Sequence, residues 1–286
     1  MKLLIDFNHL AIRTLFAPNG MDKNSEEFFP FHKHLVLSTI FSNIKKFEPT
    51  EVILAVDDKQ NWRKKVYPEY KANRKLARDA SEFSWDKYFI YMDEFLDSIT
   101  DLPFKVLRVP FCEADDVIAV ISKYHQQACT IVTSDSDYIQ LLQYKHIKLY
   151  DPLKKKFVED KEPLKTLKIK IIKGDSGDNI PGIKTRVGEK TAIKLIENNE
   201  LDNFLKDDII NNNYNRNEKL ISFNHIPSVV QKEILNKYNN YTFKKEHLDY
   251  HSWFVNHKLR DLTSKLQVLV PVLKKLESKS TLMDIF

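Results

Sequence analysis

The chain has 286 residues, 42% of them hydrophobic, which is enough apolar content to bury a substantial core in one large or two smaller globular domains. Its 45 Lys and Arg residues only slightly exceed its 40 Asp and Glu residues, so the whole-chain charge identifies no partner. No apolar run approaches the ~18 residues of a membrane span, which excludes a membrane-spanning class, and the two cysteines lack metal-ligand spacing, which favours a reducing compartment. We therefore expect a monomeric cytoplasmic protein without a membrane partner.

Five short apolar runs in the first half of the chain are predicted strands. They cover residues 2–6, 51–57, 105–110, 129–135 and 146–151. Segments of helical length lie between them, at residues 31–47, 85–100 and 113–125. Alternating strands and helices are typical of a mostly parallel sheet with helices on both faces, so we predict an α/β core over residues 1–152.

Helical patterns replace the strand signals after about residue 152. Residues 189–199 and 228–241 have helical periodicity, whereas the Asn-rich stretch 209–219 is typical of a loop or a link between helices. We therefore predict a second, helical region over residues 153–280.

Three predicted strands end in an aspartate: Asp6, Asp57 and Asp135. Parallel strands bring such ends together at one crevice of the sheet. Six more acids stand close to a predicted strand end, at a predicted helix start or in a glycine-rich segment: Glu113, Asp115, Asp116, Asp137, Asp175 and Asp178. Carboxylates gathered in this way repel one another unless cations neutralise them, and all-oxygen ligand sets select Mg²⁺ or Mn²⁺. Two such ions about 4 Å apart can clamp the attacking and leaving oxygens of a phosphodiester, so the acids favour metal-assisted phosphoryl hydrolysis.

Cations and aromatic rings are interleaved in residues 59–78. This segment holds eight basic residues and a single acid, Glu69, together with Trp62, Tyr67 and Tyr70. Phosphates attract the cations and unpaired bases stack on the rings, so the segment favours a nucleic-acid partner, with a solvated helix face as the alternative. Its candidate contacts are Arg63, Lys64, Tyr70 and Arg78.

Four of the five glycines fall within residues 173–190: Gly174, Gly177, Gly182 and Gly188. Glycine is favoured where the backbone takes positive φ or approaches a ligand closely. The segment is therefore a candidate ligand-binding loop, with a pair of ordinary turns as the alternative.

The order of these motifs resembles the flap endonuclease superfamily of 5′ nucleases, in particular its phage-encoded ribonuclease H branch. The resemblance covers at least residues 3–197 and rests on Asp6, Asp57 and the stretches YPEYKANR, EADD, TSDSD and GDSGDNIPG. It implies a PIN-like fold with a helical arch at about residues 71–91. It also implies a 5′ to 3′ exonuclease or flap endonuclease with ribonuclease H activity, which removes primers from lagging-strand fragments during DNA replication.

The resemblance further implies where this enzyme works and on what. Branched or nicked duplex DNA and RNA/DNA hybrids would be its substrates, a single-stranded DNA-binding protein would be a partner, and the cytoplasm of a bacterial or phage-infected cell would be its location.

In that family the acids hold two Mg²⁺ ions, for which Mn²⁺ can substitute. The resemblance assigns five carboxylates to the first metal, with Asp116 beside them: Asp6, Asp57, Glu113, Asp115 and Asp135. It assigns three to the second, partly through water: Asp137, Asp175 and Asp178. Lys71 and Arg74 match the cations that contact the scissile phosphate at the base of the arch. Water attacks the phosphorus and leaves a 5′ phosphate and a 3′ hydroxyl.

The glycine segment continues into a stretch that resembles a helix-hairpin-helix, at about residues 174–197. Backbone amides of this motif grip duplex phosphates. Its candidate contacts here are Gly182, Lys184, Arg186, Gly188 and Lys190. The family's second glycine is missing, because residues 184–186 fill that interval; this argues against a bound monovalent cation and for side-chain contacts in place of some amide contacts.

The last six residues, TLMDIF at 281–286, resemble the short peptides by which replication enzymes dock on sliding clamps. The anchors would be Leu282, Ile285 and Phe286. A tail helix that folds onto the core is the alternative.

Two other functions remain open from the residues alone. A phosphatase of the haloacid dehalogenase type also places an aspartate after its first strand, but Asn8 stands where its second acid belongs. A structure-specific DNA-binding protein without catalysis fits the cations, although nine carboxylates in a groove would not help it to bind phosphates. The balance of exonuclease and endonuclease action, and of RNA and DNA preference, also remains open.

Overall fold

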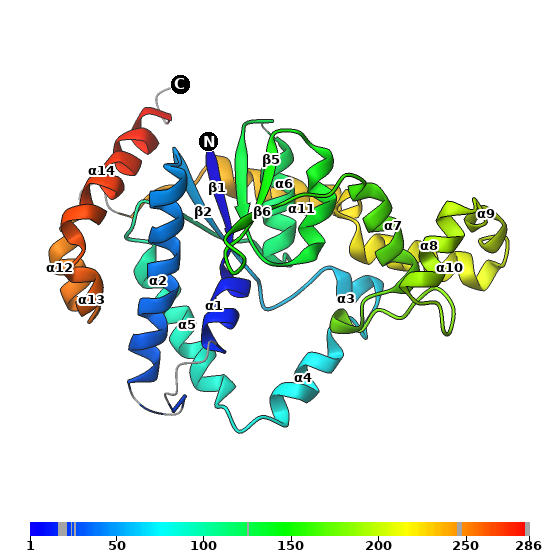
Figure 1. The fold of residues 1–286 in the computed structure, drawn as a ribbon. Helices are drawn as coiled ribbons and strands as arrows, with labels where there is room; N and C mark the ends of the chain where they lie inside the picture. Colours follow the sequence, from blue (N-terminus) through cyan, green and yellow to red (C-terminus); the bar gives the residue numbers. More distant parts are fainter. Residues whose placement is uncertain (17–21, 24, 26, 125, 245–247, 284–286) are drawn as a thin grey trace.

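A six-stranded sheet forms the centre of the protein (Figure 1), in a computed structural model that describes residues 1–286 except 17–21, 24, 26, 125, 245–247 and 284–286. The strands are β1 (Lys2–Asp6), β2 (Glu51–Val56), β3 (Lys105–Arg108), β4 (Cys129–Val132), β5 (Ile147–Asp151) and β6 (Lys156–Val158). Their order is β3-β2-β1-β4-β5-β6, and every pair is parallel except β5 with β6. The predicted mostly parallel sheet is confirmed. The edge strand β6 was not predicted, since its three residues carry no apolar run.

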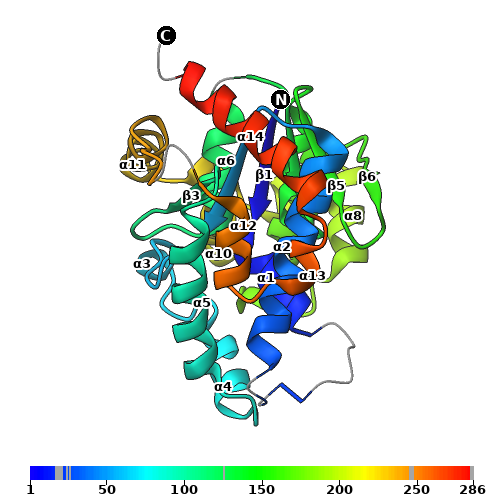
Figure 2. The same cartoon turned by 90° about the vertical axis from the view of Figure 1, so that its left-hand side faces the viewer.

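Helices cover both faces of the sheet (Figures 1 and 2), because successive strand residues point to opposite sides. Leu3 and Ile5 of β1 belong to one core and Leu4 to the other. The first core includes α1 (Phe7–Leu15), α2 (Phe28–Phe47) and α5 (Trp85–Ile99). The second includes α6 (Ala114–Tyr124), the 3₁₀ helix η1 (Ser136–Gln143) and α11 (Ser228–Asn239).

A group of helices extends beyond one edge of the sheet (Figure 1) and has small cores of its own. It consists of α7 (Pro163–Lys173), the 3₁₀ turn η2 (Ser176–Asp178), α8 (Glu189–Glu197), α9 (Leu201–Phe204) and α10 (Asp208–Ile221). The short turn η3 (Phe223–His225) then leads to α11. We call the segment from α7 to α10 the hairpin module.

The last helices return to the sheet. They are α12 (Tyr250–Asn256), α13 (Arg260–Thr263) and α14 (Leu266–Met283), and Phe254 and Leu273 are buried in the first core. Within residues 153–280, the hairpin module thus has cores of its own, whereas the last helices share the first core of the sheet.

The Asn-rich stretch 209–219 is not a loop: it lies within α10. Asp207 caps this helix by accepting bonds from the backbone N–H groups of Ile209 and Ile210. The amide of Asn217 is buried and donates to the carbonyls of Ile171 and Pro181. Tertiary contacts thus override the weak helix propensity of asparagine.

The predicted arch consists of α4 (Ala72–Asp79), the link 80–84 and the first turns of α5. It follows the short helix α3 (Arg63–Val66), and α4 has no buried residue. Figure 1 shows α4 and the start of α5 projecting together from the body of the molecule.

Among the described residues, no helix is both long enough and apolar enough to cross a membrane. Of the predicted clamp anchors, Leu282 falls in the last turn of α14, whereas Ile285 and Phe286 lie outside the described residues.

Candidate active site

Three aspartates meet at the carboxyl end of the sheet because their strands are neighbours. Asp6 ends β1, Asp57 directly follows β2, and Asp135 lies just beyond β4. β1 pairs with both β2 and β4, so the chain order of the strands reverses direction at this place. Ligand sites of open α/β sheets form at such a switch point.

Local hydrogen bonds hold these carboxylates in place. Asp6 accepts from the backbone N–H of His9 at 2.9 Å and from the hydroxyl of Tyr138 at 3.0 Å. Asp57 accepts from the backbone N–H of Ala114 at 2.8 Å, at the start of α6. These bonds fix the positions of the acids without neutralising them.

The acids line a crevice of about 580 Å³ that opens toward the arch. Five of the predicted metal ligands contribute to it: Asp6, Asp57, Glu113, Asp115 and Asp135. Four cations line it as well: Arg13, Lys71, Arg74 and Arg78. The crevice therefore combines carboxylates that suit a hard divalent cation with cations that suit a phosphate.

The electrostatics of the crevice show a strained set of carboxylates. Burial and the neighbouring Asp57 raise the pKa of Asp6 to about 7. Burial also raises the pKa values of Asp57 and Asp115. Glu113 is the exception, because Lys71 and Arg63 outweigh burial and lower its pKa to about 2. A bound cation would favour the charged carboxylates, which burial and the neighbouring acids disfavour.

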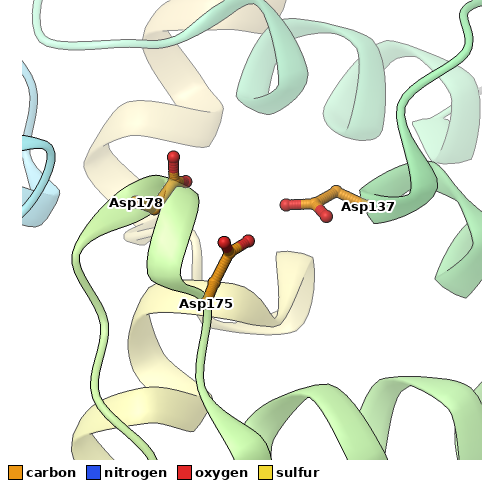
Figure 3. Close-up of side chains that lie close together, drawn as sticks. All are labelled: Asp137, Asp175 and Asp178. Atoms are coloured by element: carbon orange, nitrogen blue, oxygen red, sulfur yellow. The ribbon is translucent and has the colours of Figure 1, made fainter. Parts of the chain in front are cut away.

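A second carboxylate cluster lies where η1 faces the glycine segment. Asp137, Asp175 and Asp178 point toward one another (Figure 3), and their carboxylate oxygens lie within 4.8 Å of one another. Asp137 comes from η1, Asp175 caps η2 and Asp178 is its last residue. This cluster contains the three acids that the family resemblance assigned to a second metal.

Lys170 of α7 occupies the position of a counter-ion in this cluster. Its ammonium group contacts Asp137 and lies 2.7 Å from Oδ2 of Asp175. Lys170 outweighs burial and lowers the pKa of Asp175, whereas burial keeps the pKa of Asp137 raised at about 6. The sequence did not single out Lys170, since α7 carries several lysines at similar spacing.

The stretch around Lys71 is joined to the glycine segment. The backbone N–H of Lys71 donates to the carbonyl of Asp178 at 2.9 Å, and the side chain of Asn73 donates to the carbonyl of Ser176 at the same distance. Nη2 of Arg74 lies 2.6 Å from Oδ1 of Asp178. Two motifs about 100 residues apart thus form one surface.

Lys71 itself has a strained backbone. Its φ of 57° is left-handed, which is costly for a residue with a side chain. Its ammonium group contacts Glu113 and lies 3.7 Å from Asp178, so it is placed between the two carboxylate groups.

Three predicted site residues are not available to a ligand. Arg63 is only 1% exposed, and its guanidinium donates to Glu113, to both oxygens of Asp116 and to the carbonyl of Leu220. Asp116 is fully buried in this ion pair, so its carboxylate is not free to act as a direct metal ligand. The expected nucleic-acid contact of Arg63 is wrong for the same reason: buried charges must be paired, and these two satisfy each other.

Tyr70 is likewise buried instead of offering a ring to a base. Its hydroxyl donates to Glu113 at 2.8 Å and reaches Asp178 at 3.1 Å. Tyr70 thus positions one carboxylate of the crevice and one of the second carboxylate cluster. Of the other predicted contacts in this segment, Lys64 is exposed and Arg78 lines the crevice.

The glycine segment turns sharply at Gly174, whose φ is 77°. A Cβ here would lie 2.3 Å from the carbonyl oxygen of Ile180, so only glycine fits. The hairpin loop then exposes Lys184, Arg186 and Lys190, with Gly182 half-buried and Gly188 exposed at the N-terminus of α8. Arg186 has a φ of 65° in the interval where the family resemblance predicts a glycine.

His9 and Arg13 of α1 also line the crevice and were not predicted. They follow Asp6 by three and seven residues, and this helical spacing from a strand-end aspartate was a usable signal. Trp85 and Phe89 were missed as well, since their apolar pattern was indistinguishable from that of a core helix.

This fold and this arrangement of acids define a PIN-like 5′ nuclease. Residues 1–170 match the family model described as the 5′–3′ exonuclease, N-terminal resolvase-like domain. The chain belongs to this 5′–3′ exonuclease family of nucleases, which act as hydrolases on phosphodiester bonds, and the sequence-based resemblance is confirmed.

Relatives support the same membership. The chain is 32% identical over 289 residues to ribonuclease H of Enterobacteria phage T4. The aligned region covers 92% of this chain and 94% of the phage protein. It is 31% identical over 222 residues to DNA polymerase I of Lactococcus lactis, covering 68% of this chain and 24% of that much longer protein.

Solved structures share the fold. A flap endonuclease of bacteriophage T5, solved in a pseudo-enzyme–product complex with DNA and metal ions, matches with a TM-score of 0.64 at 18% identity, covering 82% of this chain and 97% of that chain. The catalytic core of Rad2 in complex with DNA substrate matches with a TM-score of 0.50 at 16% identity, covering 95% and 92%.

Proposed function

We propose that this protein is a divalent-metal-dependent 5′ nuclease that cuts phosphodiester bonds at the 5′ ends or flaps of DNA and RNA/DNA duplexes. Its role would be to remove primers from lagging-strand fragments during DNA replication. The observation that carries the proposal is the crevice itself, where five carboxylates and the cations Lys71 and Arg74 face the same space. A phosphatase of the haloacid dehalogenase type is not supported, because the chain belongs to another family.

The residues present fit two Mg²⁺ ions, or Mn²⁺ in their place. One group is the set of five crevice acids, and the other is Asp137, Asp175 and Asp178, whose oxygens are close enough to share an ion. Both groups offer only oxygen atoms, which hard divalent cations prefer. Bound ions would neutralise the carboxylates and act as Lewis acids on the phosphodiester.

The chain's own cations would bind and orient the scissile phosphate. Lys71 and Arg74 now pair with Glu113 and Asp178, and metal binding at these acids would free both cations for the phosphate oxygens. Attack of a water oxygen on phosphorus breaks the bond to O3′, which leaves a 5′ phosphate and a 3′ hydroxyl. The attacking water gives a proton to solvent, and the departing O3′ takes one from solvent.

The hairpin module would hold the duplex beside the cut. Gly188 caps α8 with no neighbouring atom where a Cβ would stand, so backbone N–H groups at this helix start are open to a phosphate. Lys184, Arg186 and Lys190 add exposed charge around it. Lys64 and Arg78 would contribute contacts nearer the arch.

The decisive test compares 5′-labelled nicked duplex, 5′-flap and RNA-primed duplex substrates with Mg²⁺ and with EDTA. We expect cleavage of at least one substrate with Mg²⁺, and its product lengths would separate exonuclease from flap endonuclease action. A product formed equally in EDTA would overturn the mechanism, and no product with either Mg²⁺ or Mn²⁺ would overturn the function.

Docking of the C-terminal residues on a sliding clamp is a further part of the proposed role, together with a single-stranded DNA-binding protein as partner and a monomeric enzyme. Deletion of residues 281–286 should abolish stimulation by the clamp while leaving clamp-independent cleavage intact. Unchanged stimulation would exclude this contact.

A further inference from the structure

The crevice has one wall that carries no charge. Ile12 of α1 and Trp85 and Phe89 of α5 line the same crevice as the cations and the carboxylates. The rings of Trp85 and Phe89 lie 6.0 Å apart and are tilted by 32°. Phe89 remains 44% exposed, so an aromatic surface is open to the crevice.

The two rings of this wall differ in how they are held. Trp85 packs edge-on against Phe83 at 5.1 Å and against Tyr88 at 5.8 Å, and Tyr88 is buried. Phe89 stands at the edge of this group, with the guanidinium of Arg78 from α4 at 5.8 Å from its ring. Trp85 thus supports a phenylalanine whose ring contacts among the described residues are Trp85 and Tyr88, with Arg78 as the cation over its ring.

The composition of the crevice points to the kind of ligand that would cover this wall. An exposed ring costs free energy in water unless it meets an apolar surface, yet the rest of the crevice suits phosphate and metal ions. A nucleotide supplies both, with its phosphate for Lys71 and Arg74 and its base for the ring. Bases within a duplex are already stacked on one another, so the base in question is unpaired.

We propose that Trp85 and Phe89 form a nucleobase subsite that stacks an unpaired base of the 5′ strand, within three nucleotides of the scissile phosphate. This inference rests on the proposed 5′ nuclease function and assigns it a specificity element. Phe89 contacts the base, Trp85 is a positioning residue behind it, and Arg78 moves from the ring to a neighbouring phosphate. Every nucleobase has a flat face that can stack on an aromatic ring, so the subsite tolerates any base.

The test combines a protein change with a substrate change in one cycle. Single-turnover cleavage of a 5′ flap is measured for wild type and Phe89→Ala, on the intact strand and on strands with one abasic site at each of the three positions on either side of the cut. Base-aromatic stacking is worth enough to predict a loss of about tenfold for Phe89→Ala on the intact flap. An abasic site at the stacked position should lower the cleavage rate of wild type by a similar factor. It should not lower the rate of Phe89→Ala any further.

Two variants separate stacking from a structural role. Phe89→Tyr keeps a ring and should cleave within about twofold of wild type. Ile90→Ala removes an even more exposed apolar side chain from the neighbouring position of α5, which does not line the crevice, and should leave every rate unchanged. A 2-aminopurine placed at the coupled position and bound in Ca²⁺ should be quenched by wild type and not by Phe89→Ala.

If Phe89→Ala lowers the cleavage rate by the same factor on every abasic strand, the subsite does not exist and Phe89 only stiffens the arch. If it does not lower the rate on the intact flap, the subsite does not exist either. Failure of the proposed function would look different, because wild type itself would then cut none of the strands.

Discussion

The ammonium group of Lys170 lies 2.7 Å from Oδ2 of Asp175 and also contacts Asp137, so a lysine stands among three carboxylates whose oxygens lie within 4.8 Å of one another. Burial opposes its charge, but the two aspartates outweigh burial and raise the pKa of Lys170. Lysine and a divalent cation therefore compensate the same negative charge, and they should compete for it.

We predict that Lys170→Ala lowers the melting temperature in EDTA and increases the stabilisation that Mg²⁺ provides. Removing one partner of a largely buried ion pair leaves uncompensated charge, at a cost of about 3 kcal/mol. The measurement is thermal unfolding across a Mg²⁺ titration. As a control, Lys168→Ala removes an exposed lysine of the same helix and should leave the Mg²⁺ dependence unchanged. Equal Mg²⁺ stabilisation of wild type and Lys170→Ala would contradict the competition.

Asp135→Asn should reduce cleavage by more than about 100-fold while binding to branched DNA stays within about threefold of wild type. The amide oxygen can still accept the bond from the backbone N–H of Asp137, so the turn is preserved. Asp151→Asn is the matched control, since Asp151 also ends a strand but does not line the crevice. Substantial cleavage by Asp135→Asn would remove this acid from the catalytic set.

In the metal-free protein, the stability contributed by Asp6 should increase as the pH falls from about 8 toward 4, against an opposite contribution from His9 and His32, whose pKa values burial lowers. The pKa of Asp6 is raised from 3.8 to about 7 in the folded state, so the folded state binds a proton more tightly than the unfolded state. The stability contributed by this protonation is complete below pH 3.8 and is lost as the pH rises through 7. Asp57, Asp115 and Asp137 act in the same direction, whereas Glu113 and Asp175, with lowered pKa values, act in the opposite direction.

Asp6→Asn isolates this contribution. In EDTA at pH 8 it should raise the melting temperature by about 2 to 6 °C, and the difference should vanish below about pH 3, where Asp6 is protonated in both the folded and the unfolded state. Thermal unfolding across this pH range measures it, with the exposed Asp79→Asn as control. A difference in melting temperature between Asp6→Asn and wild type that does not depend on pH would show that the charge of Asp6 is not the cause.

Replacing Arg186 by glycine should separate backbone strain from phosphate contact in the hairpin. Its φ of 65° is unfavourable for arginine, so Arg186→Gly should fold with equal or up to about 1 kcal/mol greater stability. Loss of the cation should reduce the slope of log K against log salt for duplex binding by about 1. Lys156→Ala on the edge strand β6 is the control and should leave the slope unchanged. An unaltered slope in Arg186→Gly would mean that its side chain does not reach the duplex.

Gly174→Ala should be among the most destabilising single changes in the chain. Its Cβ would lie 2.3 Å from one backbone atom and within 2.7 Å of two others, in a left-handed conformation, so we expect a loss of more than about 4 kcal/mol. Gly188→Ala introduces the same group into open space and should cost about 1 kcal/mol or less. Denaturant unfolding of both variants provides the comparison, and similar losses would contradict the steric argument.

Five strands of the sheet and the gathering of Asp6, Asp57 and Asp135 could be predicted from sequence, because a strand buried on both faces is a continuous apolar run and its end is marked by the first acid. The Asn-rich helix α10 could not, because its helical state depends on Asn217 donating to two distant carbonyls. The short strand β6 was missed for a similar reason. Its three residues carry no apolar run, and their strand conformation depends on pairing with β5.

The sequence by itself determined the α/β sheet, the acids that follow its strands and the glycine turn, because these depend on local conformation and on patterns that repeat along one segment. Only the tertiary structure decided which charges are free to act. Arg63 and Asp116 look like ligands in the sequence but neutralise each other in the interior, while Lys170 and Phe89 look ordinary and stand at the site. Whether a charge is buried with a partner or exposed to a ligand depends on contacts between distant segments, and no local pattern records them.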